Sequence, residues 1–232
     1  MYRVLFAIFF FFSFVFSAVA DDFKKAFEEY KKKDYQSALR LFEPLAENGS
    51  DRATHMLGIM HLYGRGVAKN YQIAINFFSR SAKLGVVNSA EILGQIYHGN
   101  ELGKPDYKKA IKWYTLAVEL GSADAGYWLG KMWSMGNGTI AHDKTAVHWF
   151  LIAAERGNSG AQQELADRYL VGMGVAKSYV RAHMWYNIAA SNGNQSARNM
   201  INNHLLEKMT PSQVSKAQDL AFECIKRKYQ GC

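Results

Sequence analysis

Apolar and glycine positions recur along this chain with a period of 36 residues. Four series share this period without insertion: the glycines Gly49, Gly85, Gly121, Gly157 and Gly193; the alanines Ala74, Ala110, Ala146 and Ala182; the aromatics Phe77, Trp113, Trp149 and Trp185; and the pairs Leu57-Gly58, Leu93-Gly94, Leu129-Gly130 and Leu165-Ala166. Several registers in phase over this length indicate an internal structural repeat.

Each repeat is predicted to contain two helices. The second helix of the first repeat carries a face with the helical spacing i, i+3, i+4, i+7, i+8, formed by Ala74, Phe77, Phe78, Ser81 and Ala82. These second helices are expected to begin after the 36-spaced residues Asp34, Asn70, Asp106, His142 and Ser178, four of which are good N-cap residues. They are expected to end at the glycine series, because glycine closes a helix in the left-handed conformation without a Cβ penalty.

The first helices are predicted to bury a line of their own, which in the first repeat is Ala53, Leu57 and His61. A small residue beside that line, at Gly58, Gly94, Gly130 and Ala166, lets the partner helix approach closely. One helix pair cannot bury its aromatic face alone, whereas stacked pairs bury a continuous core. The predicted fold is therefore all-α, a right-handed α-solenoid of helix-turn-helix repeats.

The amino terminus has the pattern of a secretory signal peptide. Arg3 precedes an uncharged apolar run over residues 4–16, and Ala18-Val19-Ala20 supplies a small-residue cleavage site, so cleavage is predicted after Ala20. A membrane anchor is the alternative, but a bilayer span needs roughly 20 apolar residues. Residues 21–232 are predicted to form one solenoid: N-terminal capping helices over 21–48, four repeats over 49–192 and C-terminal capping helices over 193–232.

The carboxyl end is predicted to close the solenoid with one more helix. Thr210-Pro211-Ser212-Gln213 has the pattern of a capping box with proline at the first helical position. An apolar stripe follows, made of Val214, Ala217, Ala221, Cys224 and Ile225. In an oxidising compartment we expect a disulfide between Cys224 and Cys232, with two free thiols as the alternative. Their spacing is not Cys-x-x-Cys, which gives a redox-catalytic role little support.

The fourth repeat shows a family resemblance most clearly. Its motif consists of Leu165, Tyr169, Gly172, Gly174, Tyr179, Ala182, Trp185-Tyr186, Ala189-Ala190 and Gly193. The motif resembles the Sel-1-like repeats, relatives of the tetratricopeptide repeats. The second repeat departs from it, since its loop "HGNELGKPD" has glycines at Gly99 and Gly103. The resemblance implies a scaffold or adaptor that binds proteins, in bacteria often at the envelope or toward a host, with no reaction and no cofactor.

The stretch "YGRGVAKN" at residues 63–70 has the glycines and cations of a loop that cradles an anion. Its copies keep most of the glycines, but Arg65 becomes Glu101, Asn137 and Met173 in later repeats. A phosphate site would need a cation in a constant place, whereas a turn needs only glycine's freedom to take positive φ. We interpret these loops as turns.

The chain offers little in the way of reaction chemistry. It contains no Ser-x-x-Lys motif, and Ser159 lies in an incomplete nucleophile-elbow pattern at an inter-repeat turn. The seven histidines have no metal-ligand spacing. The recurring tryptophans are interpreted as core packing. We therefore predict no enzyme activity, no catalytic or metal-binding residues and no cofactor.

The candidate binding residues lie where the repeat varies, on a face of the first helices displaced from the buried line. A partner-binding groove is predicted from Arg52, His55, Met56, Ile59, Glu91, Ile92, Gln95, Tyr127, Trp128, Lys131, Gln163, Glu164 and Asp167. Apolar and aromatic anchors with a polar surround suit a peptide or helix partner. The alternative, that these residues pack between neighbouring repeats, stays open.

Signal peptide, repeats and resemblance together predict an exported adaptor, periplasmic or secreted, that binds an unidentified protein or peptide, such as a cell-wall enzyme or a host protein. The net charge is +8, and it becomes +7 without Arg3. Lysine clusters near both ends are interpreted as solvated faces, and no nucleic-acid partner is predicted. The alternative is a peptidoglycan- or cell-wall-enzyme-associated periplasmic protein, and a weaker one is β-lactam-hydrolase-like activity.

Overall fold

The computed structural model describes residues 21–232. The predicted signal peptide, with its cleavage point after Ala20, lies outside the described residues. The described chain divides into two compact units, one up to Leu93 and one from Gly94 to Cys232, with the boundary inside helix α5. Each unit is described by itself.

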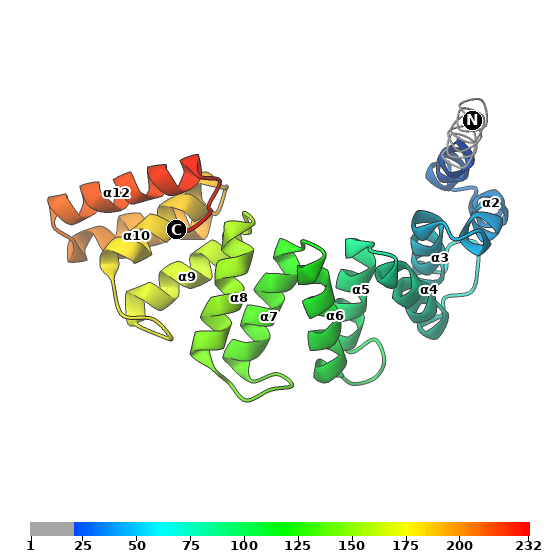
Figure 1. Cartoon of the computed structure of the whole chain (residues 1–232), viewed down its shortest axis with the longest axis horizontal. Helices are drawn as coiled ribbons and strands as arrows, with labels where there is room; N and C mark the ends of the chain where they lie inside the picture. The colour runs from blue at the N-terminus through cyan, green and yellow to red at the C-terminus, as the bar shows by residue number, and fades with distance from the viewer. Residues whose placement is uncertain (1–20) are drawn as a thin grey trace, which may run out of the picture. The chain divides into compact units, whose positions relative to one another are not determined.

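Helix pairs follow one another through the described chain at the predicted period (Figure 1). Residues 21–31 are helical. The first helices of the repeats are α3 (Asp51–Tyr63), α5 (Val87–His98), α7 (Ala123–Met135) and α9 (Ser159–Val171). The second helices are α2 (Tyr35–Glu47), α4 (Tyr71–Lys83), α6 (Tyr107–Glu119), α8 (Asp143–Glu155) and α10 (Tyr179–Ser191). The fold is therefore an all-α solenoid of helix pairs, as predicted.

The predicted helix starts and stops are confirmed. Side chains at Asp34, Asn70, Asp106, His142 and Ser178 each accept a hydrogen bond from a backbone N–H in the first turn of the helix that follows. His142, the weakest cap by residue type, accepts from Thr145 N through Nδ1 at 3.2 Å. The five glycines of the 36-residue series all have positive φ, between +87° and +106°.

The Gly-x-Gly loops are turns that also pack against the preceding repeat. In unit 1, a Cβ at Gly66 would lie 2.8 Å from the carbonyl oxygen of Tyr35, the first residue of α2. Arg65 donates to the hydroxyl of Tyr30 and lies 5.0 Å from the ring centroid of Tyr63. The cation that suggested a phosphate cradle is thus used in a structural contact.

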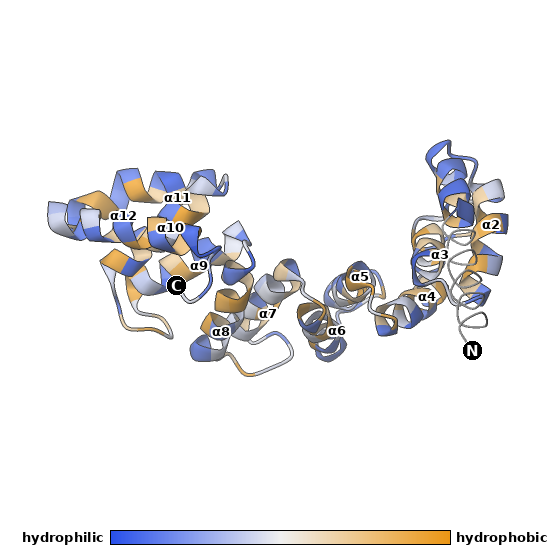
Figure 2. Cartoon of the chain, turned by 45° about the horizontal axis from the view of Figure 1, so that its top comes forward, coloured by the Kyte–Doolittle hydropathy of each residue, from blue (hydrophilic) through white to orange (hydrophobic). Residues whose placement is uncertain are grey.

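The core of each repeat is an aromatic ring packed on a small residue of the partner helix. A Cβ at Gly58 would lie 2.7 Å from the ring of Phe78, and a Cβ at Gly130 would lie 2.5 Å from the ring of Phe150. The predicted close approach of the helices is confirmed. Figure 2 shows apolar and polar residues alternating around the helices, as one buried face per helix requires.

The aromatic series that recurs from Phe77 in the sequence is only partly buried in three of its four members. The fully buried rings are those of Phe78, Tyr114, Phe150 and Tyr186, whereas Phe77, Trp113 and Trp149 are only half-buried. The 78 series, and not the 77 series, faces the small residue of the first helix. Trp185 is buried at 1 % exposure, in the repeat where α11 and α12 pack against α10.

The carboxyl end closes unit 2 with α11 (Gln195–Met200), a π-helical turn (Ile201–Leu205), a 3₁₀ turn (Leu206–Lys208) and α12 (Pro211–Lys226), which lies along α10 in Figure 1. The predicted capping box is present: Thr210 Oγ1 accepts from Gln213 N, and Gln213 Oε1 accepts from Thr210 N. Ala217, Ala221 and Cys224 are buried as predicted. Ile225 is 40 % exposed, so the predicted stripe is narrower than expected.

The last residues fold back onto the repeats. The Sγ atoms of Cys224 and Cys232 lie within bonding distance, with their Cα atoms 5.5 Å apart. Between them, the Tyr229 hydroxyl donates to Asn192 Oδ1 at 2.8 Å and Gln230 Nε2 donates to the Glu155 carbonyl at 3.0 Å. The tail therefore contacts two different repeats of unit 2.

Candidate protein-binding surfaces

The predicted groove residues divide between the two units. In unit 1, Arg52 is exposed, Ile59 is half-buried, and Met56 is 8 % exposed within the hydrophobic core. Met56 is therefore not accessible as an apolar anchor. Glu91 and Ile92 are half-buried on the part of α5 that belongs to unit 1.

His55 serves packing between repeats. Its Nδ1 lies 2.7 Å from Ser89 Oγ, which donates in turn to Ser81 Oγ at 3.0 Å. Its ring also contacts that of Phe78, with centroids 5.6 Å apart. Burial lowers the pKa of His55, which favours the neutral ring in this setting. For His55 the packing alternative describes the observed contacts.

In unit 2, Trp128 is the largest half-buried residue of the predicted set. Its indole contacts the His98 ring edge-on, with centroids 5.3 Å apart. The Tyr127 ring contacts Trp128 edge-on, with centroids 5.6 Å apart, and also packs against Phe150 at 6.1 Å. It lies 3.3 Å from the Cβ position at Gly160 on α9. Tyr127 is therefore a packing residue between repeats, while Trp128 lies beside the C-terminal end of α5.

Charged groups join α7 to α9 next to Trp128. Lys131 Nζ donates to Glu164 Oε1 at 2.9 Å, and this hydrogen bond raises the pKa of Lys131. Gln163, on the same helix as Glu164, is half-buried, and Gln95 on α5 is exposed. We call Trp128, Lys131, Gln163 and Glu164 the α7–α9 face.

Asp167 is tied to the next helix. It accepts a hydrogen bond from the hydroxyl of Tyr186 on α10, a residue whose ring is fully buried. Burial raises the pKa of Asp167, and the hydrogen bond from Tyr186 partly opposes that rise. Burial also raises the pKa of Tyr186, so the phenol stays protonated and acts as the donor. Asp167 thus links α9 to α10.

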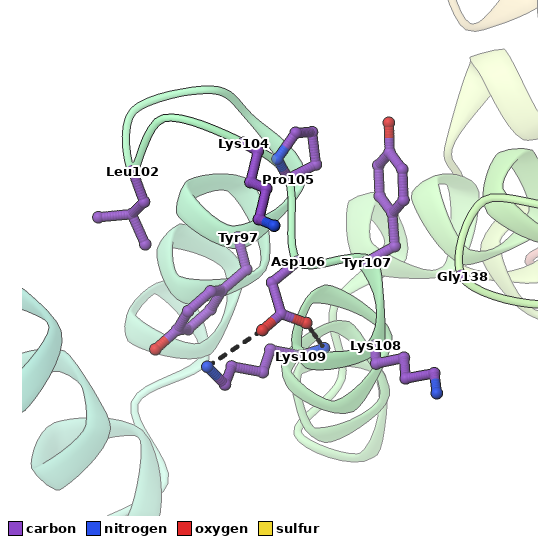
Figure 3. A pocket seen from close by; sticks show the side chains of 9 residues that line it. All are labelled: Tyr97, Leu102, Lys104, Pro105, Asp106, Tyr107, Lys108, Lys109 and Gly138. Atoms are coloured by element: carbon purple, nitrogen blue, oxygen red, sulfur yellow. Dashed lines mark hydrogen bonds and ion pairs between the residues drawn. The ribbon is translucent and has the colours of Figure 1, made fainter.

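A pocket of about 460 Å³ lies in unit 2 where the α5–α6 loop meets the start of α6 (Figure 3). Its lining comes from three elements: Tyr97 on α5; Leu102, Lys104 and Pro105 in the loop with residues 106–109 after them; and Gly138 in the α7–α8 loop. Figure 3 shows Tyr97 and Tyr107 on opposite sides of Lys104 and Asp106.

The pocket wall carries more cations than anions. Asp106 caps α6 by accepting from Lys109 N at 3.1 Å and pairs with Lys109 Nζ at 3.0 Å, and the backbone hydrogen bond lowers the pKa of Asp106. Among the described residues, no carboxylate pairs with Lys104 or Lys108. The wall therefore has two lysines that form no salt bridge with a described residue, and three lysines against one carboxylate.

Sequence reasoning did not identify this pocket, although the irregular loop of the second repeat was a signal. Leu102 occupies the position that is Gly66, Gly138 and Gly174 in the other repeats. Those glycines have φ between +74° and +76°, a region that leucine avoids. In this loop, Gly103 takes the positive φ instead, at +91°.

The serine and histidine residues considered for catalysis or metal binding make contacts within the fold. Ser159 begins α9, and its carbonyl accepts from Asn194 Nδ2 at 3.3 Å. His183 is buried, with its Nδ1 3.0 Å from Asn187 Nδ2. Within residues 21–232, no three His, Cys, Asp or Glu side chains lie close enough together to hold a metal ion. No helix in the same range has the length and apolar character needed to cross a bilayer.

Capped helix pairs that recur at a fixed period define this molecule as an α-solenoid repeat protein. The family model of the Sel1 repeat matches residues 29–50, 51–86, 89–122, 123–158 and 159–194. The chain belongs to the Sel1 repeat family. Its first match covers α2, in the segment predicted to be N-terminal capping helices. Sel1 repeats generally mediate protein–protein interactions and are typically non-catalytic scaffolds.

Two solved structures support this assignment. A Sel1 repeat protein from Oxalobacter formigenes is 26 % identical and superposes with a TM-score of 0.71, over 89 % of this chain and 88 % of that one. A protective antigen present in uropathogenic Escherichia coli strains, which displays an SLR fold, is 31 % identical with a TM-score of 0.70 over 83 % of this chain. The match covers 42 % of the antigen's chain. A search of curated proteins finds no match.

Proposed function

We propose that this protein is an exported, non-catalytic adaptor that binds a protein partner through the α7–α9 face. The observation that carries the proposal is the half-buried Trp128, three residues before Lys131 on α7, where Lys131 pairs with Glu164 of α9. An aromatic anchor next to partly exposed charged groups is the arrangement that interface hot spots have.

The repeat itself does not require tryptophan at this position. The residues equivalent to Trp128 at intervals of 36 are Met56, Ile92 and Glu164. Met56 is buried in the core of unit 1, whereas Trp128 is half-buried, so the tryptophan is not enclosed as the methionine is. The indole is therefore better accounted for by a binding role specific to this repeat.

The amino-terminal pattern and the paired cysteines support export. A signal peptide directs the chain to a compartment in which a Cys224–Cys232 disulfide persists. The test is the mass of the protein recovered from the periplasm and from the medium of bacteria that express the full chain. We expect the mature chain to begin at Asp21. A chain recovered only in the cytoplasm with residues 1–20 retained contradicts export.

Partner binding is tested by photo-crosslinking. A benzoylphenylalanine replaces Trp128 in one variant and Trp149, a half-buried tryptophan on the second helix α8, in a matched control. We expect a discrete protein adduct from position 128 that is absent from position 149. Equal adducts from both positions, or none from position 128, overturn the assignment of this face. Retention on purified cell-wall sacculi without a protein adduct favours the polymer-binding alternative.

A further inference from the structure

The pocket at the α5–α6 loop differs from the corresponding place in every other repeat. The residues equivalent to Lys104 at intervals of 36 are Ala68, Ile140 and Ala176, so a lysine occurs there in this repeat alone. The residues equivalent to Lys108 are Gln72, Lys144 and Val180, so one other repeat also has a lysine there. The turn that joins two helices of a Sel1 repeat therefore does not require these lysines. Folding of the loop gives no reason for their presence.

Helix stability gives no reason for them either. Lys108 lies in the first turn of α6, where the helix dipole disfavours a positive charge, and no acidic side chain lies in that turn. Asp106 is already engaged by Lys109. With Lys104, Lys108 and Lys109 against Asp106 alone, the pocket wall has a net positive charge, which favours an anionic ligand.

The walls of the pocket add an apolar and aromatic contribution. Leu102 is 42 % exposed, and Pro105 and the rings of Tyr97 and Tyr107 are half-buried. Peptide recognition combines such surfaces with a few charged groups, whereas a bare polyanion uses the charges alone. The mixture favours a protein segment over a polymer of phosphates.

The pocket also connects to the face that carries the proposed function. The ring of His98 contacts Tyr107 in the pocket wall, with centroids 5.7 Å apart, and Trp128 at 5.3 Å. Burial lowers the pKa of His98, which keeps this connecting ring neutral. The His98 ring therefore lies between the pocket wall and Trp128.

We propose that this pocket binds an acidic segment of the protein partner, with carboxylates at Lys104 and Lys108 and an apolar or aromatic side chain against Leu102 and Tyr107. The inference rests on the proposed function, because it names the chemistry of the partner that the adaptor holds. Its test uses a direct probe, so that its failure is separate from a failure of the crosslinking experiment at Trp128.

The probe is a fluorescein-labelled peptide of glutamate and aspartate around a central tyrosine, titrated with the mature chain and followed by fluorescence anisotropy. The test variant is Lys104→Glu/Lys108→Glu. The matched control, Lys144→Glu/Lys216→Glu, makes the same change in net charge at exposed lysines outside the pocket. Circular dichroism and thermal melting establish that both variants fold, and Lys104→Gln/Lys108→Gln replaces the test variant if it does not.

We expect the pocket variant to weaken binding by about tenfold or more, because each reversal replaces an attraction with a repulsion, and the control by about twofold or less. Equal weakening in both variants shows attraction to net charge alone and overturns the proposal. So does an absence of peptide binding, or a preference for phosphatidylglycerol vesicles over the peptide.

Discussion

Lys131 and Glu164 form an ion pair between the first helices of successive repeats, with Nζ and Oε1 2.9 Å apart. Both residues were predicted to line a binding groove, and the pair also joins α7 to α9. The side chains of Lys131 and Glu164 are 31 % and 24 % exposed to solvent. Lys131 and Glu164 therefore pack between repeats and are also accessible to a partner. In the sequence analysis, packing and partner binding were treated as alternatives for these residues.

The ion pair should contribute little to stability. Because water still reaches both side chains, a double-mutant cycle with Lys131→Ala and Glu164→Ala is expected to give a coupling free energy below about 1 kcal/mol. Urea unfolding of the four proteins measures it. A coupling of several kcal/mol would mean that the pair is a structural clamp, and that the α7–α9 face is not free to exchange its contacts for a partner.

Glycine is needed in this fold for two reasons, positive φ and close approach of another backbone segment, and Gly174 and Gly193 allow the two to be measured separately. Both have positive φ, +75° and +88°, but a Cβ at Gly174 would lie 2.6 Å from the Asp143 carbonyl oxygen, while nothing lies within 4 Å at Gly193. We expect Gly193→Ala to cost about 1 to 2 kcal/mol, from the left-handed conformation alone. Gly174→Ala should cost clearly more, because backbone must shift. Equal losses in urea unfolding would contradict the close approach of the loop.

Asp167 should make stability depend on pH. Burial raises its folded-state pKa above the ordinary 3.8, so folding takes up a proton in the window between these two values. The stabilisation is fully present below the ordinary value and is lost as the pH rises through the folded pKa. Relative to Asp167→Asn, the wild type should therefore lose stability as the pH rises from 3.8 through the folded-state pKa. Urea unfolding across this range measures the difference.

Tyr186→Phe provides the second arm of that experiment. The variant keeps the buried ring and removes the hydrogen bond that lowers the pKa of Asp167. The upper end of the pH window should move to higher pH. An unchanged pH profile in Tyr186→Phe would show that this hydrogen bond does not act on the carboxyl group.

The free energy of unfolding should depend on whether Cys224 and Cys232 are oxidised to a disulfide. A loop of this size is worth roughly 2.5 kcal/mol in the chain-entropy model. We expect Cys224→Ser/Cys232→Ser, or a reductant added to the wild type, to lower the free energy of unfolding by up to about that amount. Reductant should have no further effect on the double variant. Two reactive thiols in protein purified from the envelope would contradict the disulfide.

Local features of the fold were predictable from the sequence. The helices after Asn70 and Ser178 begin with a hydrogen bond from the backbone N–H three residues later to the side chain of the cap. Because both partners lie within one turn, the residue type of the cap is enough to predict the helix start from the sequence. The 36-residue period and the small residues at Gly58 and Gly130 gave the helix pairing. Each repeat needs the same N-cap residues and the same small residues, and their recurrence every 36 residues makes them recognisable in the sequence.

The sequence alone determined that this chain is a series of capped helix pairs, because periodicity and capping act within a few turns of helix. The sequence placed both Phe77 and Phe78 on the buried face; tertiary structure decided that Phe78 is fully buried against Gly58 while Phe77 is half-buried at the edge of the core. It also gathered Tyr97, Lys104 and Lys108 around one pocket. These residues come from α5, the α5–α6 loop and α6, and a one-dimensional pattern does not record how close such segments lie.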